Sequence, residues 1–246
     1  MDQQSGYFLS LPEISRYARV ITYDQRGHGK NKNANHDNVT MDTLASDLNE
    51  LIQGLGLKDI TLLGWSMGAG VVLNYMECYG CDSLRQAVIC DMAPKQINDS
   101  SWHLGLYQGR YTQADAERDI SKDFITLYQA FATAAVPMLS MMPGFLLIPI
   151  LKKKLSDCDE KTMKSLSLSM KEKDYRESVE KITVPFAYFY AVPGSLYSPE
   201  LAQWYEEHVH AEYAAVPFEN STHMMIMDHP EKFAQEVIRV LENSRR

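Results

Sequence analysis

The sequence predicts an α/β protein with a mostly parallel sheet, helices on both faces of that sheet and a helical insertion. Short apolar runs alternate with segments of helical periodicity in the first and last thirds of the chain. About ninety residues between two predicted strands have helical periodicity and no strand pattern. With 246 residues, 45% of them hydrophobic, the chain can bury one sizeable core.

The first third of the chain has a clear order of elements. Thr40 or Asp42 lies near the start of one run of helical spacing, and Gly54 and Gly56 mark its end, as expected at the two ends of a helix. Small residues after Ser66 continue into a second helical pattern. The predicted elements are a strand at 19–23, a helix at 41–55, a strand at 60–64 and a helix that begins after Ser66.

The remaining elements alternate in the same way. Pro230 is well placed at a first helical position, because its missing N–H would be unbonded there. The predicted elements are strands at 86–90, 184–191 and 212–218, and helices at 199–210 and 230–241. We therefore expect a core of residues 1–104 and 180–246, with residues 105–179 as a helical cap insertion.

Composition limits the partners of the protein. A formal net charge of -8 makes nucleic acid and anionic membrane surfaces poor partners. The most apolar stretch, residues 138–151, is too short to span a bilayer. Four cysteines are too few for a disulfide framework, so a cytoplasmic location is expected. Neither a phosphate-binding glycine loop nor a metal-ligand cluster stands out, so no cofactor is predicted. The oligomeric state stays open.

Ser66 lies in Gly64-Trp65-Ser66-Met67-Gly68, which fits the G-x-S-x-G pattern of a nucleophile elbow. Such a serine stands on a strained turn between a strand and a helix, and the predicted elements on either side provide that context. The N-terminus of the following helix favours negative charge, so the Met67 N–H is the expected oxyanion donor.

His223 is the best candidate for the general base that Ser66 needs. It lies in the loop after the last predicted strand, at the sheet edge where Ser66 should emerge. An exposed loop histidine without a catalytic role is the alternative interpretation.

Four segments together resemble the α/β-hydrolase superfamily, of the esterase, lactonase and perhydrolase-like kind. They are YDQRGHG (23–29), LLGWSMGAG (62–70), VICDMAPK (88–95) and STHMMIMDHPEKF (221–233). The resemblance implies a serine hydrolase that attacks an acyl carbonyl with Ser66, with His223 as base and then as acid.

The triad acid departs from the usual pattern of the superfamily. Relatives usually carry this acid after the penultimate strand, where residues 191–199 hold no carboxylate. Some members place it one strand earlier, and Asp91 occupies that position. Asp91 is therefore the predicted partner of His223, within hydrogen-bond reach. The alternative is that Asp91 only caps the turn after its strand.

The N-terminus departs from the pattern as well. Relatives have about three further strands before the segment that matches residues 6–17, and the third ends in a His-Gly loop that donates an oxyanion N–H. We therefore expect a truncated form of a longer hydrolase. If the chain folds as given, hydrogen-bond accounting predicts that residues 19–23 pair directly with residues 60–64.

The predicted function is hydrolysis of a carboxylic ester or related acyl bond of a small, largely apolar molecule, through an acyl-enzyme on Ser66. Apolar side chains are expected to line the substrate pocket, namely Trp65, Met141, Met142 and Phe145. A methionine-rich stretch can equally be ordinary core. The alternative functions are a non-catalytic ligand-binding or sensor protein on the same fold, and an inactive truncated hydrolase.

Overall fold

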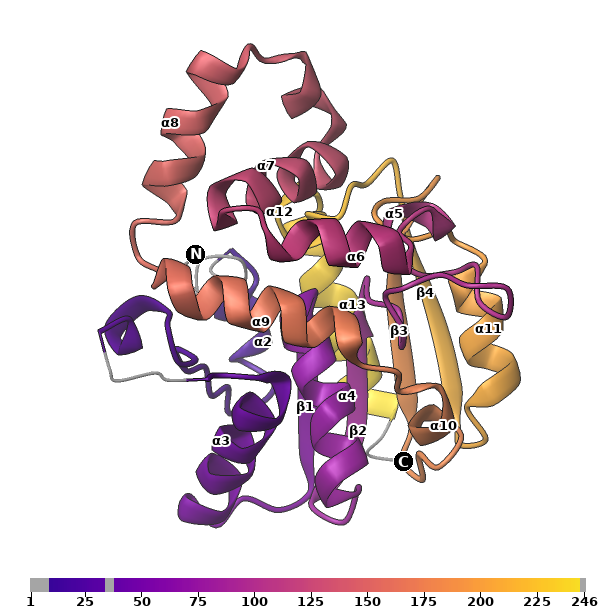
Figure 1. Ribbon diagram of the computed structural model, residues 1–246. Coiled ribbons are helices and arrows are strands. Elements are labelled where there is room, and N and C mark those ends of the chain that lie inside the picture. Colours follow the sequence, from indigo (N-terminus) through magenta and orange to yellow (C-terminus); the bar gives the residue numbers. More distant parts are fainter. Residues whose placement is uncertain (1–8, 34–37, 244–246) are drawn as a thin grey trace.

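The computed structural model describes residues 9–33 and 38–243. In this part of the chain four parallel strands form one sheet in the order β1-β2-β3-β4. The strands are β1 (Ile60–Trp65), β2 (Leu84–Cys90), β3 (Phe186–Val192) and β4 (Tyr213–Glu219). Helices lie on both faces of the sheet (Figure 1), which confirms the predicted fold class.

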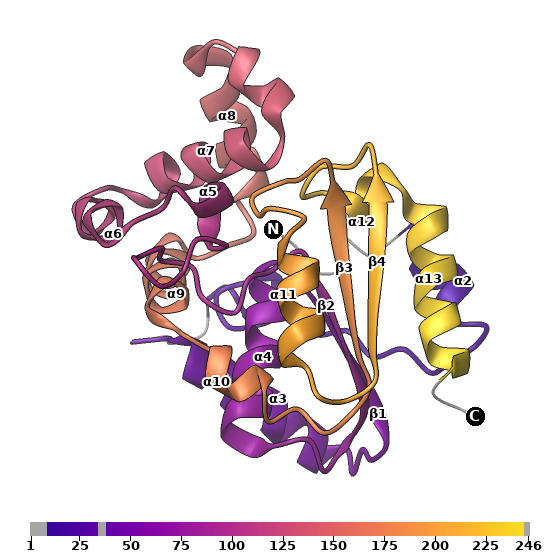
Figure 2. The same cartoon turned by 90° about the vertical axis from the view of Figure 1, so that its right-hand side faces the viewer.

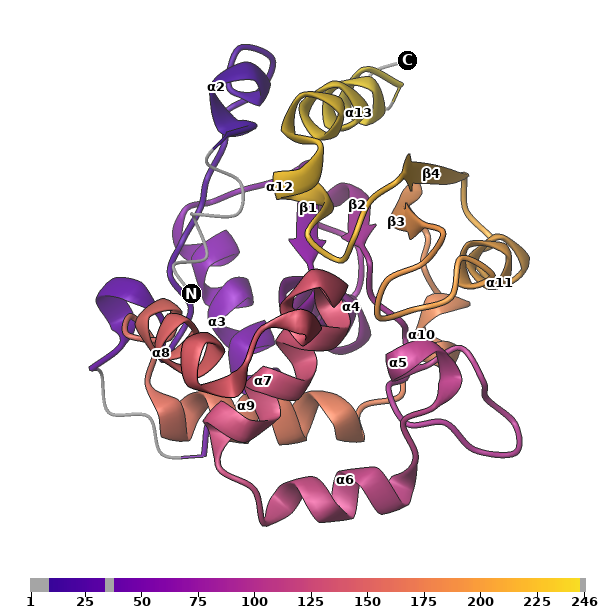
Figure 3. The same cartoon turned by 90° about the horizontal axis from the view of Figure 1, so that it is seen from above.

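Helices α3, α4 and α11 cover one face of the sheet, whereas α2 and α13 cover the other (Figure 3). The helices outside the stretch between β2 and β3 are α2 (Leu11–Ile14), η1 (Gly29–Asn31), α3 (Met41–Gly54), α4 (Met67–Tyr79), α11 (Leu201–His208), α12 (Met225–Asp228) and α13 (Pro230–Asn243). Thr40 caps α3 by accepting a hydrogen bond from the N–H of Thr43, and α13 begins at Pro230, as the sequence predicts.

Because both faces of the sheet are covered, alternate residues of each strand enter different halves of the core. Ala87 and Ile89 of β2 belong to the cluster that contains the apolar side chains of α3 and α4. Val88 and Cys90 belong to the cluster that contains Phe233, Ala234 and Val237 of α13. The continuous apolar run of β2 follows from this two-sided burial.

Residues 19–23 do not form a strand, which corrects the sequence prediction. The backbone over residues 19–25 has no sheet pairing, and β1 pairs only with β2 among the described residues. The expected direct pairing with β1 is therefore also wrong. Residues 18–23 and β1 line the same cavity of about 740 Å³. Ile60 and Ser66 donate their N–H groups toward β2, so the alternate residues Thr61 and Leu63 direct their backbone groups to the open edge.

The chain between β2 and β3 is helical throughout its regular parts and rises above the sheet (Figure 2). Its helices are α5 (Leu106–Gly109), α6 (Gln113–Ile120), α7 (Phe124–Ala135), η2 (Pro137–Met141), α8 (Gly144–Lys154), α9 (Glu160–Glu172) and α10 (Arg176–Val179). Figure 2 shows α7 and α8 at the end to which the strands point.

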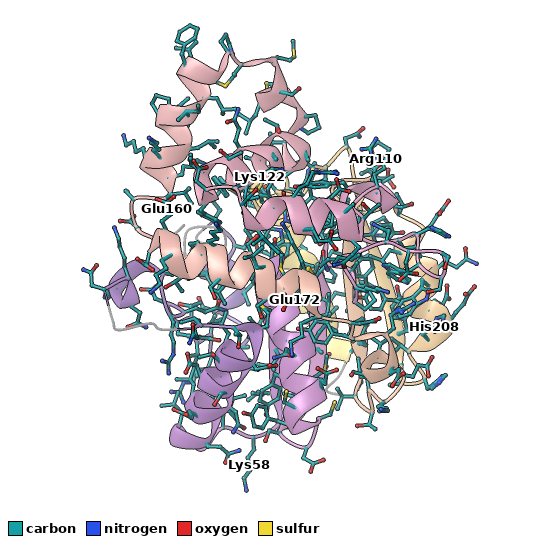
Figure 4. All side chains as sticks on the ribbon, viewed as in Figure 1. Lys58, Arg110, Lys122, Glu160, Glu172 and His208 are labelled. Carbon is teal, nitrogen blue, oxygen red and sulfur yellow. The ribbon has the colours of Figure 1, made fainter. Side chains whose placement is uncertain are left out.

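A buried ionic cluster joins α6 to α9. Oδ2 of Asp119 accepts hydrogen bonds from Nζ of Lys171 and from Oη of Tyr111, each at 2.7 Å. Lys122, labelled in Figure 4, donates to the other oxygen at 2.9 Å from a more exposed position. Burial raises the pKa of Asp119, but these three donors together outweigh it and lower that pKa to about 2.

Asp119→Asn is expected to lower the free energy of unfolding by about 3 kcal/mol at pH 7, because Lys171 would keep a buried charge without its partner. The folded-state pKa lies below the unfolded value. The contribution of Asp119 is therefore present above about pH 4 and is lost as the pH falls toward 2. Urea unfolding at pH 7 and at pH 3 should show the difference from wild type shrinking at pH 3. Lys122→Met, the exposed control, should cost less than about 1 kcal/mol, and equal losses in both variants would contradict this account.

Candidate active site

Ser66 stands between the end of β1 and the start of α4 in a strained backbone conformation. Its φ of 55° and ψ of -126° lie outside the regions that residues with a side chain ordinarily adopt. Its backbone N–H donates to the carbonyl of Cys90, which fixes the turn against the neighbouring strand. The sequence predicts this strand, tight turn and helix, and the strain is that of a nucleophile elbow.

The two glycines of the elbow have different roles. A Cβ on Gly64 would lie 2.3 Å from the carbonyl oxygen of Gly68 and 2.6 Å from Cα of Ala69, whereas a Cβ on Gly68 would meet nothing within 4 Å. Only Gly64 permits the close approach of β1 to α4.

Gly64→Ala is therefore expected to lower the free energy of unfolding by about 3 kcal/mol, since backbone atoms must move to admit the methyl group. Gly68→Ala should leave stability unchanged or raise it by up to about 1 kcal/mol, because alanine favours a helix. Urea unfolding of the two variants measures the contrast. Similar stability of both proteins would show that the turn has room at Gly64.

The N-terminus of α4 offers free backbone donors beside Ser66. The carbonyl of Ser66 accepts the N–H groups of Ala69 and Gly70. Among the backbone hydrogen bonds of the described residues, the N–H groups of Met67 and Gly68 have no partner. The predicted oxyanion donor Met67 thus has its N–H at a helix end that favours negative charge.

Asp91 and His223 meet across the sheet edge, as the sequence predicts. Oδ2 of Asp91 lies 2.7 Å from Nδ1 of His223, and the two side chains are only 2% and 1% exposed. Asp91 follows β2 directly, with a left-handed φ of 47°, and its N–H donates to the carbonyl of Phe189. An ionised carboxylate can only accept hydrogen bonds, so this contact places the histidine proton on Nδ1.

Two aromatic side chains pack against the ring of His223. The ring centroids of Trp65 and Phe131 lie 5.3 and 5.5 Å from that of His223, and Nε1 of Trp65 donates to the His223 carbonyl at 2.8 Å. Nε2 of His223 is buried and has no hydrogen-bond partner in the described structure. The structure therefore shows the histidine and the acid joined, without a hydrogen bond from Nε2 to Ser66.

The cavity along β1 reaches the elbow. Its lining includes Trp65, Ser66 and Met67 together with Phe131 of α7. Of the residues predicted to line the substrate pocket, Trp65 lines this cavity, whereas Met141, Met142 and Phe145 do not. Met141 and Phe145 are 83% and 76% exposed, because η2 and the start of α8 turn these side chains to solvent. Met142 packs instead against the small cluster of Leu147 and its neighbours.

His28 also lines this cavity, but no carboxylate among the described residues holds its ring as Asp91 holds that of His223. Its Nδ1 contacts the carbonyl of Arg26 at 3.0 Å. Burial lowers the pKa of His28 to about 4, so its ring is neutral at pH 7. Of these two histidines, His223 is the one whose ring contacts a carboxylate.

Sequence reasoning did not predict the contacts that two further residues make at this site. Ser195 contacts Asp91. The one feature of the sequence that points to this contact is the position of Ser195 in the loop after β3, where relatives carry the acid. Phe131 contacts His223 from α7, and helical periodicity alone cannot distinguish it from other apolar residues of that helix.

Comparisons with known proteins agree with the observed fold. A family model described as alpha/beta hydrolase fold matches residues 5–229. A non-heme chloroperoxidase from Kitasatospora aureofaciens is 41% identical over 76 residues, which are 31% of this chain and 27% of that protein. The match thus spans little more than a quarter of that relative.

Two solved structures share the fold over nearly the whole chain. An esterase from Exiguobacterium antarcticum superposes with a TM-score of 0.79 at 23% identity, over 97% of this chain and 87% of that one. A bromoperoxidase from Bacillus anthracis gives a TM-score of 0.78 at 21% identity, with the same shares covered.

Proposed function

This chain belongs to the α/β-hydrolase fold family, and we propose that it is a serine hydrolase that cleaves a carboxylic ester or related acyl bond. The observation that carries the proposal is the buried pair of Asp91 and His223 beside the strained elbow of Ser66. A hydroxyl is a weak nucleophile without a base, and a histidine held by a carboxylate provides that base.

In the proposed reaction Ser66 attacks the acyl carbon while Nε2 of His223 takes its proton. The resulting imidazolium is stabilised by Asp91, and the N–H of Met67 stabilises the oxyanion that forms. His223 then returns the proton to the leaving alcohol. In the second half of the reaction, Nε2 of His223 takes a proton from water, which attacks the acyl carbon. His223 then returns the proton to Ser66 as the acyl group leaves.

A small, largely apolar acyl compound is the proposed substrate. Trp65 and Phe131 give the cavity apolar walls at the point where Ser66 lines it. We also propose that residues 105–179 act as the cap over a core of residues 1–104 and 180–246, with α7 contributing Phe131 to the site.

Four free cysteines favour a reducing, cytoplasmic location. In the described part of the chain, no helix has the length and apolar character that a membrane crossing needs.

A fluorophosphonate probe followed by peptide mass spectrometry tests the proposal. The probe should label Ser66, and p-nitrophenyl esters of short acyl chains should be hydrolysed. A folded protein that neither reacts with the probe nor hydrolyses any ester would instead support a ligand-binding or sensor role.

A further inference from the structure

We propose that Ser195 is a positioning residue that holds the carboxylate of Asp91 in line with His223. The proposal rests on the proposed function, because it assigns Asp91 the role of the triad acid. Oγ of Ser195 donates a hydrogen bond to Oδ2 of Asp91. The same oxygen accepts the hydrogen bond from Nδ1 of His223. One carboxylate oxygen therefore joins the loops that follow β2, β3 and β4.

Asp91 needs this second donor because its carboxylate is buried. A charged oxygen taken out of water is costly unless hydrogen bonds replace those it loses. Two donors on one oxygen also restrict rotation about the two side-chain bonds of Asp91. With only the His223 donor, the carboxylate could turn and the N–H···O contact would lose its alignment.

The position of Ser195 does not depend on its own hydroxyl group. Its N–H donates to the carbonyl of Tyr197 at 3.2 Å, and its carbonyl accepts from Nε2 of Gln108 at 2.9 Å. The N–H of Gln108 also donates to the carbonyl of Leu196 at 2.8 Å. These bonds anchor the loop to α5, so Ser195→Ala should remove the contact with Asp91 and leave the loop in place.

Other titratable groups near the pair do not change charge in the relevant range. Burial raises the pKa of each neighbouring group well above its ordinary value, so each stays neutral between about pH 5 and 9. The groups whose charge would interact with Asp91 are Cys90, Tyr188 and Tyr197. In the His223 loop, Oδ2 of Asp228 accepts the N–H of Thr222, a contact that a substitution at Ser195 leaves unchanged. A change in the NMR resonance of the proton on Nδ1 of His223 therefore reports on Asp91 and Ser195.

The first test follows the NMR resonance of the proton on Nδ1 of His223, which requires no turnover. In Ser195→Ala the carboxylate of Asp91 is free to turn, so its hydrogen bond from Nδ1 should weaken and that resonance should move upfield. Ser195→Thr keeps the hydroxyl and should give the wild-type resonance. The His223 signal is assigned from its absence in His223→Gln. An unchanged resonance in Ser195→Ala would overturn the proposal.

The second test compares kcat and KM for an ester, with active molecules counted by fluorophosphonate labelling. Ser195→Ala should lower kcat per labelled molecule about tenfold with KM unchanged, and Ser195→Thr should restore it. A merely structural role would instead reduce the labelled fraction and leave kcat per labelled molecule at the wild-type value, which would contradict the proposal. If the wild-type protein hydrolyses no ester, the proposed function fails, and the NMR resonance of His223 still decides the role of Ser195.

Discussion

Ser66→Ala is expected to lower kcat/KM for any ester substrate by a factor on the order of 10⁴ or more, because no other group can form the acyl-enzyme. Stability should stay within about 0.5 kcal/mol of wild type. Alanine has the same Cβ as serine, so the strain at φ 55° is unchanged, and the Ser66 side chain makes no capping bond to α4. We therefore expect Ser66→Ala to lose catalytic activity without losing stability.

Ester kinetics and urea unfolding of the purified variant measure the two effects separately. Ser140→Ala is the matched control, because Ser140 is exposed in η2, outside the elbow. It should retain full activity and full probe labelling. Undiminished hydrolysis in Ser66→Ala would mean that a different nucleophile forms the intermediate. The assignment of Ser66 as the nucleophile would then be wrong.

The sequence carries most of the information on the elements that position the site. Thr40 and Pro230 mark helix starts because capping and the missing proline N–H act locally. The contact between Asp91 and His223 could also be predicted. Each of these residues follows a parallel strand, and the carboxyl ends of parallel strands share one edge.

The sequence-based predictions that differ from the structure concern properties that depend on residues far away in the sequence. Residues 19–23 have a strand pattern, but a strand exists only where another strand offers its hydrogen bonds, and β1 does not pair with them. Phe145 and Met141 are apolar, yet the direction of a side chain depends on how its helix packs, which the sequence pattern does not fix. The contact of Ser195 with Asp91 depends on a loop fold that no periodicity encodes.

Asp91→Asn is expected to lower kcat by roughly 10³ to 10⁴-fold, with little change in KM. The amide has nearly the size of the carboxylate, so the packing around this buried position is kept. It can, however, present its NH₂ group to Nδ1 of His223, which then becomes the acceptor. The histidine proton moves to Nε2, the nitrogen that must take the proton of Ser66, and no negative charge remains to stabilise the imidazolium.

Steady-state kinetics of Asp91→Asn measure this loss, and Glu219→Gln provides the matched control. Glu219 ends β4, is exposed, and precedes His223 by four residues, so its substitution removes a nearby carboxylate without touching the buried pair. It should change kcat by less than about twofold, because an exposed charge is screened by solvent. Wild-type kcat in Asp91→Asn would show that Asp91 only ends the turn after β2. A larger loss in Glu219→Gln than in Asp91→Asn would move the role of the acid to Glu219.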